Sequence, residues 1–492
     1  MNSAQNDSVS VLKVILGSIK ELRDTCVAFV AAPRVLWGVN LANIIEGLVY
    51  FGVLTILGKF CSENLNLSDL QAGWVYGFVT GGITFAMLLF GGVSDRIGVR
   101  NSLILSFAGM LIGRILIASS GSFHLSNGVG SPMFFLMIAG IFVMVVAYGL
   151  FQPAIYSAVK KYASPAVAPM AYAALYGGMN LGSFLSGFIS PLTRQHFEKT
   201  FPPNGLTSVF WVYAVLTFIS LLIIVLLVTK KQDAVVQADV VVGASDDSAA
   251  TESIWKKFLS TFDPLRDKRF LFFIFMLIPV QTLFAHNWLT IPYYLDRAYA
   301  GTSVSRYYEF FSNLNPLIIF ILSPLVAGLT LRANVYNMMI LGTTVMALPT
   351  FLIALGTNVY LFLTYIVLMS VGEAMWSPRF LQWVAEIAPK GKIGAYQGVG
   401  QFPWFLTKLI TSTFSGYFVA TYLPKAETGL PVRPQMMWLI YGLIAMITPI
   451  GLMAAKKWMK QKSSFEETKE TEQGLQPLIQ LSKPVSTIES DI

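Results

Sequence analysis

The chain contains 492 residues, of which 55% are hydrophobic and only 12% are charged. This composition excludes an ordinary soluble globular protein and favours a protein embedded in a membrane. The formal net charge of +8 reflects basic loops on one side of the membrane, so it gives no reason to expect a nucleic-acid partner. The sequence has no nucleophile motif and no phosphate-binding loop, so an enzyme is not expected.

Apolar segments of about 20 residues, the length that crosses a bilayer as a helix, recur along the whole chain. Backbone polar groups in lipid must bond to one another, so each segment is expected to be an α-helix. The sequence therefore predicts an all-α membrane protein with twelve transmembrane helices, at 34–58, 70–93, 102–119, 132–157, 168–191, 208–228, 269–292, 307–329, 336–356, 359–385, 395–420 and 435–455.

Most Lys and Arg residues fall in the termini and the even-numbered loops. This bias predicts that both termini are cytoplasmic. Within residues 1–33, the stretch VLKVILGSIKELRD mixes apolar and charged residues at helical spacing, which is typical of a helix lying along a membrane surface. Its charges exclude a signal peptide. We expect a multi-pass protein of the cell membrane, or of the inner membrane in a Gram-negative organism.

A polar segment at 229–268 separates the first six predicted helices from the last six. We therefore expect an N-terminal six-helix bundle at 34–228 and a C-terminal six-helix bundle at 269–455. Residues 456–492 form a polar tail that is expected to be disordered. The two cysteines, Cys26 and Cys61, fall on opposite sides of the membrane in this topology, so neither a disulfide nor a metal cluster is expected.

The two halves contain similar stretches. FQPAIYSAVKKYASP in the fourth helix corresponds to WSPRFLQWVAEIAP in the tenth, with Pro153 and Pro378 at matching positions. An internal repeat of this kind indicates a transporter whose central site lies where two pseudo-symmetric bundles meet. Chance similarity between two membrane helices is the alternative.

The loop between the second and third helices reads GGVSDRIGVRNS. Asp95, Arg96 and Arg100 in this loop can make charge-assisted hydrogen bonds to neighbouring helix ends. The pattern resembles the signature loop of the major facilitator superfamily, G-x-x-x-D-R-x-G-R-R. The resemblance implies that these three residues act in the conformational switch and do not contact substrate. The matching loop of the second half, AGLTLRANVYN, lacks the acidic residue.

Four further stretches are similar to motifs of the proton-dependent oligopeptide transporter family, a branch of that superfamily. They are EGLVYFG in the first helix, YGGMNLGSFLSG in the fifth, LNPLIIFILSP in the eighth and GEAMWSPRFLQWVAEIAP in the tenth. The chain thus resembles a divergent member of this family. The resemblance implies symport of small peptides, or of a related small organic solute, by alternating access. It implies a proton gradient as the driving force and no cofactor.

The departures from the family pattern concern charge. Glu46 and Tyr50 keep two positions of the helix 1 motif E-x-x-E-R-F-x-Y-Y-G, but Asn43 stands at its first Glu and its Arg is absent. In the family, a Lys in helix 4 pairs with a Glu in helix 10. Here Gln152 replaces that Lys while Glu373 keeps the Glu. The basic residues that bind a peptide carboxylate in the family are therefore missing, which also allows a non-peptide cargo.

Charged residues near the middle of a membrane helix are costly and are usually functional. We predict that Glu46, Glu373 and Lys408 take part in proton coupling. Our hypothesis is that Lys408 replaces the missing basic residues and pairs with Glu373 or Glu46. The alternatives are that Lys408 lines the cavity without a fixed partner, or that its helix boundaries are misplaced.

The resemblance also implies which side chains face the substrate: Asn43, Tyr50, Gln152, Gln281, Asn315, Ser377 and Trp404. Asn315 has the alternative role of bonding the backbone freed by Pro316, and Trp404 has that of a packing aromatic. His286 could relay protons, but a hydrogen-bonded structural histidine is the favoured interpretation. For Arg379, snorkelling to the headgroups is favoured over a gate.

The sequence thus predicts a major facilitator transporter with two pseudo-symmetric six-helix bundles, working by rocking of the bundles. Its expected partners are a small-molecule substrate and the lipid bilayer, and it is expected to be a monomer. One alternative is a proton-driven transporter that imports or exports a non-peptide solute. Another is a non-transporting receptor or scaffold with the same fold, against which the retained charges argue.

Overall fold

The computed structural model describes residues 33–460, with gaps at 91–92, 94–96, 124–125, 164–167, 231–262, 331–332, 388–398 and 401. Within these residues the elements are helical, and eight helices are long and apolar enough to cross a membrane. Helices follow all twelve predicted spans. Those of the first half are α2 (Arg34–Lys59), continued by η1 (Phe60–Asn64), α3 (Asp69–Phe90), α5 (Val99–Ser120), α6 (Pro132–Tyr162), α7 (Ala168–His196) and α8 (Leu206–Leu227).

Prolines divide several spans of the second half into shorter helices. Pro279 lies in the first turn of α12 and Pro292 in the first turn of α13, where the missing backbone N–H costs no helical hydrogen bond. The elements are η3 (Asp263–Arg266), α11 (Lys268–Met276), α12 (Ile278–Leu289), α13 (Ile291–Ala298), α14 (Ser303–Arg306), α15 (Tyr308–Ser312), α16 (Leu314–Leu329), α17 (Val335–Ala347), α18 (Thr350–Ala354), α19 (Val359–Ile387), α21 (Phe402–Tyr422), η4 (Ala426–Thr428) and α22 (Pro434–Lys460).

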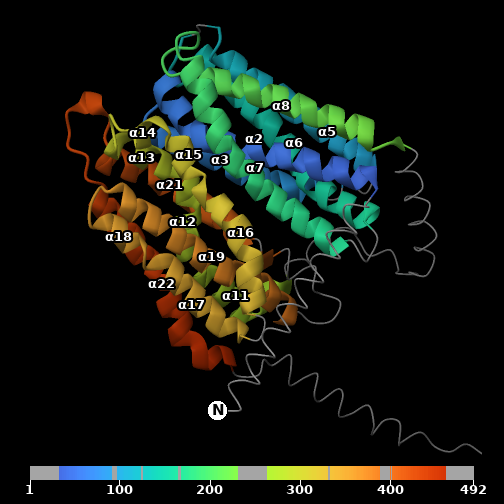
Figure 1. The fold of residues 1–492 in the computed structure, drawn as a ribbon, viewed down its shortest axis with the longest axis vertical. Helices are drawn as coiled ribbons and strands as arrows, with labels where there is room; N and C mark the ends of the chain where they lie inside the picture. Colours follow the sequence, from blue (N-terminus) through green and yellow to red (C-terminus); the bar gives the residue numbers. More distant parts are fainter. Residues whose placement is uncertain are drawn as a thin grey trace, which may run out of the picture.

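The helices form two bundles that lie side by side (Figure 1), with the first half in blue to green and the second in yellow to red. Each bundle has its own apolar core, one built from residues 35–228 and the other from residues 270–452. Trp288 and Leu289 of α12 belong to the first core although their helix belongs to the second bundle. The predicted fold class is confirmed, and α12 is one of the helices that join the bundles.

Close glycine contacts recur at equivalent places in the two halves. A Cβ atom on Gly113 of α5 would lie 2.6 Å from the carbonyl oxygen of Gly140 in α6. In the second half, a Cβ atom on Gly372 of α19 would lie 2.7 Å from the carbonyl oxygen of Gly342 in α17. Small residues let membrane helices approach this closely. The third and fourth helices thus pack like the ninth and tenth, as expected for a repeat. The close contact at Gly372 also fixes the position of its neighbour Glu373 relative to α17.

Several predictions concern residues outside the described part of the chain. They are the surface helix before the first span, the disordered tail after residue 460, and most of the polar segment between the halves. Cys26 also lies outside it, so the absence of a disulfide stays a prediction; Cys61 is buried as a free thiol. Among the described residues, no group of His, Cys, Asp and Glu side chains could hold a metal ion.

Candidate transport site

Glu46 lies at the centre of a buried polar cluster in the first bundle. Arg114 of α5 donates from Nη1 to Glu46 Oε2 at 2.8 Å and from Nη2 to Glu46 Oε1. Tyr148 of α6 donates its hydroxyl to the same Oε1, and Arg114 also donates to Thr217 of α8. Arg114 is fully buried and Glu46 is 2% exposed. The carboxylate and the guanidinium thus neutralise one another in the bidentate geometry that is strongest for this pair.

This cluster corrects the hypothesis for Lys408 in one respect. The partner of Glu46 is Arg114, on the third helix, and not Lys408. The sequence carried a signal for this, because Arg114 is a lone charge inside the apolar stretch SFAGMLIGRILIASS. The basic residue missing from the first helix therefore has a counterpart on its neighbour in the same bundle.

Glu373 has a different environment in the second bundle. Its side chain is 4% exposed, and Asn315 of α16 donates from Nδ2 to Glu373 Oε2 at 2.9 Å. The same amide lies 2.9 Å from Ser370 Oγ. Among the described residues, no Lys or Arg forms an ion pair with Glu373. Asn315 therefore holds the carboxyl group through neutral hydrogen bonding, which supports its prediction as a site residue over a purely backbone role.

Lys408 lies in α21 and is half-buried. Within the described part of the chain it forms no ion pair and no hydrogen bond with its side chain, so the predicted pairing with Glu373 is not found in this conformation. The interpretation that it lines the space between the bundles without a fixed partner agrees with the structure. Trp404, one turn away, stacks on Trp376 of α19 with ring centroids 6.2 Å apart and planes 17° apart. This side-chain contact connects α19 with α21.

The remaining predicted substrate residues divide by exposure. Asn43 is buried and donates from Nδ2 to the carbonyl oxygen of Leu175 at 2.9 Å, which joins α2 to α7. Gln281 is fully buried and accepts a hydrogen bond from Thr407 at 3.1 Å. The others are half-buried and remain available to a solute: Tyr50, Gln152, Ser377 and Trp404.

Two residues have structural partners. His286 is fully buried, its Nδ1 lies 2.7 Å from Thr290 Oγ1, and its ring stacks on Tyr441 at 3.8 Å between centroids. This agrees with the structural interpretation of the histidine. Arg379 is 8% exposed and donates to the carbonyl oxygen and the hydroxyl of Thr330 at the end of α16, a contact with protein that differs from the predicted snorkelling to the headgroups.

Of the predicted switch residues, Arg100 is described. Its Nε donates to the carbonyl oxygen of Val228 at 2.7 Å and so connects the start of α5 to the residue that follows α8. Asp95 and Arg96 lie outside the described residues. Their role in the conformational switch stays a prediction.

Charged side chains join the two bundles at one end of the molecule. We call this end, which contains η1, α13, α14 and α15, the sealed end (Figure 1). Three cross-bundle ion pairs lie there: Arg297 to Asp69 at 2.7 Å, Lys59 to Asp296 at 2.7 Å, and Arg194 to Glu309 at 2.7 Å. The sequence analysis predicted none of them.

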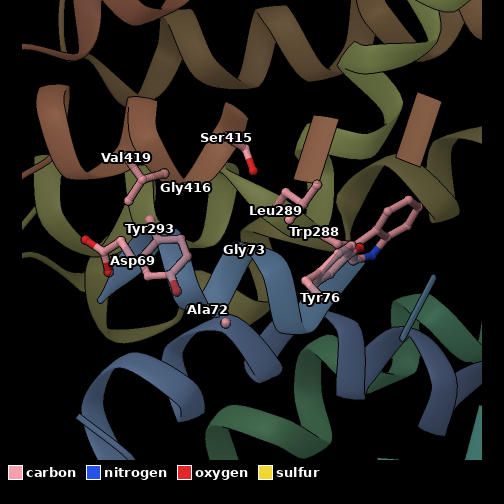
Figure 2. A pocket seen from close by; sticks show the side chains of 11 residues that line it. Asp69, Ala72, Gly73, Tyr76, Trp288, Leu289, Tyr293, Ser415, Gly416 and Val419 are labelled. Atoms are coloured by element: carbon pink, nitrogen blue, oxygen red, sulfur yellow. The ribbon is translucent and has the colours of Figure 1, made fainter. Parts of the chain in front are cut away.

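The seam between α3 of the first bundle and α21 of the second is tightly packed near the sealed end. A Cβ atom on Gly73 would lie 2.8 Å from the carbonyl oxygen of Ser412, and one on Gly416 would lie 2.6 Å from that of Asp69. Figure 2 shows the crevice beside this seam, lined also by Tyr76, Trp288 and Tyr293. It has room for no more than about one water molecule, so this crevice does not admit a solute in the present conformation.

This arrangement, with two bundles closed at one end and buried charges at mid-span, is that of a membrane transporter that opens alternately to either side. The chain belongs to the Major Facilitator Superfamily, whose model matches residues 39–402. It is 24% identical over 485 residues to dipeptide and tripeptide permease B of Yersinia enterocolitica, a match that covers 87% of this chain and 94% of the relative. An uncharacterized MFS-type transporter of Bacillus subtilis, YceJ, is 26% identical over 165 residues, or 33% of this chain and 38% of the relative.

Solved structures share the fold. A POT family transporter in complex with 5-aminolevulinic acid gives a TM-score of 0.64 at 17% sequence identity, covering 87% of this chain and 97% of that chain. The peptide transporter POT in complex with sulfate gives a TM-score of 0.62 at 18% identity, covering 87% and 95%. These similarities establish the architecture, and the resemblance to the oligopeptide branch agrees with them.

Proposed function

We propose that this protein is a proton-coupled symporter of small peptides, or of a related small solute with an amino and a carboxylate group. The observation that carries the proposal is Glu373, a buried carboxyl group at mid-span that has an amide donor but no cationic partner among the described residues. Such a group is expensive to keep in a membrane helix unless it has a function. The name of the Yersinia relative and the ligand of the solved neighbour support this class of cargo.

Proton binding at Glu373 follows from its surroundings. When the site opens to water, the carboxylate is hydrated and can exchange a proton with the solution. When the bundles close over it, the neutral acid is far less costly to enclose than an unpaired charge. If the bundles close over Glu373 only when its side chain is a neutral acid, proton movement is linked to the conformational change. Glu46 already has Arg114 as its counter-ion. We therefore propose that Glu46 contributes to coupling by holding the helices of the first bundle together.

The sealed end corresponds to the outer face in the topology with both termini in the cytoplasm. On this proposal the structure represents the inward-facing state. To open outward, the bundles must separate at this end, which requires the ion pairs Asp69–Arg297, Lys59–Asp296 and Arg194–Glu309 to break. A transported solute and the proton supply the differential binding free energy for this step.

Several accompanying proposals remain. The protein lies in the cell membrane with both termini in the cytoplasm, uses the proton gradient without a cofactor, and works as a monomer, although one solved neighbour is described as tetrameric. Proton-driven transport of a non-peptide solute is the second candidate function. The specific observation that favours it is Gln152, which stands where the oligopeptide branch has a Lys.

The test is uptake of labelled di- and tripeptides into proteoliposomes, with and without an inward proton gradient. We expect peptide accumulation above the external concentration that depends on the gradient and disappears when an ionophore collapses it. Uptake of an unrelated solute under the same gradient, with no peptide uptake, would favour the second candidate. No gradient-dependent movement of any solute in a broad screen would contradict both and favour a receptor or scaffold.

A further inference from the structure

Lys408 differs from three other described cations near or within the transmembrane helices, which have acidic partners. Arg114 pairs with Glu46, and Lys59 and Arg194 pair across the bundles with acidic residues. Lys408 has no anionic partner within the described residues, although a lone ammonium at such a depth is costly. A ligand that binds between the bundles can therefore supply the counter-charge that the described residues do not provide.

The packing of α21 shows where Lys408 lies. Ser412 and Gly416, at four and eight residues beyond it, lie on the face of α21 that contacts α3 of the other bundle, next to Gly73 and Gly77. Residues four apart share one face of a helix, so Lys408 continues this face one turn further from the sealed end. It therefore lies at the boundary between the bundles, where the packed seam ends.

The stacked tryptophans relate Lys408 to Glu373. The chain runs away from the sealed end along α19 and toward it along α21. Glu373 comes three residues before Trp376 on α19, and Lys408 comes four residues after Trp404 on α21. Both charged residues thus lie about one helical turn from the tryptophan pair, on its sealed-end side. An ammonium and a carboxyl group at about the same level on two helices of one bundle can form two separate points of attachment for one solute.

We propose that Lys408 is the anion-binding residue of the transport site and that the cargo presents a carboxylate to it. The cargo carboxylate would be held from α21 of the second bundle, and it would supply the counter-charge that Lys408 does not find among the described residues. The inference rests on the proposed function only in taking the space between the bundles as the cargo site. It makes Lys408 a specificity-determining residue, because a cargo without the carboxylate leaves the ammonium unpaired.

The first test is binding, because it does not require transport. Thermal unfolding of the purified full-length protein is followed with Ala-Ala, with 5-aminolevulinic acid, and with the carboxamide of each. In the wild-type protein we expect both acids to raise Tm at concentrations about tenfold below those needed for their amides, because a charge-assisted hydrogen bond to a carboxylate is lost in the amide. In K408Q the acids and amides should behave alike to within about twofold, while K408R should retain most of the preference.

The control is K457Q, which removes an exposed lysine at the end of α22 and should leave the acid preference unchanged. If K408Q keeps the wild-type preference, or if neither acid stabilises the wild-type protein, the assignment of Lys408 is overturned. A preference that depends on Lys408 without gradient-driven uptake of either acid would contradict the proposed function and keep this assignment. Gradient-driven uptake together with equal binding of acids and amides would keep the proposed function and overturn the assignment of Lys408.

Discussion

Arg114 and Glu46 form a bidentate ion pair inside the first bundle although 68 residues separate them in sequence. Both side chains are essentially inaccessible to solvent, and Tyr148 and Thr217 add hydrogen bonds to the pair. Four helices of the bundle, α2, α5, α6 and α8, therefore meet at one polar cluster, in which Arg114 Nε has no hydrogen-bond partner among the described residues. Breaking such a pair leaves a buried charge without a partner, whereas replacing both members does not.

This pair gives the first prediction. R114Q should destabilise the protein by about 3–5 kcal/mol, because it leaves the Glu46 carboxylate uncompensated. The double variant E46Q/R114Q should recover most of that loss, since the two remaining amides can bond to one another. The measurement is thermal unfolding of the detergent-purified protein. R433Q, which removes an exposed arginine, is the control for loss of charge alone, and equal unfolding temperatures for R114Q and R433Q would contradict the account of the cluster.

The second prediction concerns the glycine that precedes Glu373. G372A should destabilise the second bundle by about 1–3 kcal/mol, because its Cβ atom would meet the backbone of α17, with Gly342 O at 2.7 Å. G356A is the matched control, since a Cβ atom there has no neighbour within 4 Å. Unfolding temperatures of the two variants are compared. A G372A protein as stable as G356A would show that α17 and α19 do not pack this closely.

The third prediction concerns closure of the sealed end. D69N removes one member of the Asp69–Arg297 pair and should shift the population toward the outward-open state. Ser415 lines the crevice beside this pair and is 1% exposed. In a background with Cys26 and Cys61 replaced, S415C should react several times faster with a membrane-impermeant maleimide applied outside when D69N is present.

The charge-swapped variant D69R/R297D is the control for this experiment, because it restores an ion pair at the same place. We expect S415C in the swapped background to be labelled about as slowly as in the parent. Equal labelling in the parent, D69N and the swapped protein would mean that the pair does not hold the bundles together. Labelling from the cytoplasmic side instead would contradict the assigned orientation.

The helices could be predicted from the sequence because each span is an apolar run of the length that a bilayer requires. Glu373 and Asn315 are singled out as candidate site residues because polar groups inside such runs are costly, and their role stays a prediction. Their mutual contact could not be predicted, since they lie on different helices, 58 residues apart. Hydropathy fixes the depth of a residue in the membrane but not the direction in which its side chain points.

The same limit explains the partner that was assigned incorrectly to Glu46. Lys408 and Arg114 both lie inside apolar spans, and depth alone does not distinguish them. Only the arrangement of the helices within one bundle shows that Arg114 of α5 reaches the carboxylate on α2. The cross-bundle pairs were missed for a related reason. Asp69 and Arg297 are 228 residues apart and lie at helix ends. Charged residues are common at helix ends, so their presence there does not indicate a partner.

The central claim is that Glu373 carries the coupled proton, and E373Q tests it most directly in proteoliposomes. The amide is close in shape to the neutral acid but cannot release a proton. We therefore expect E373Q to lose gradient-driven accumulation of a labelled dipeptide. It should still exchange internal for external dipeptide in the absence of a gradient. E427Q, which changes an exposed residue of η4, should behave as wild type. Gradient-driven accumulation by E373Q at the wild-type level would contradict the account.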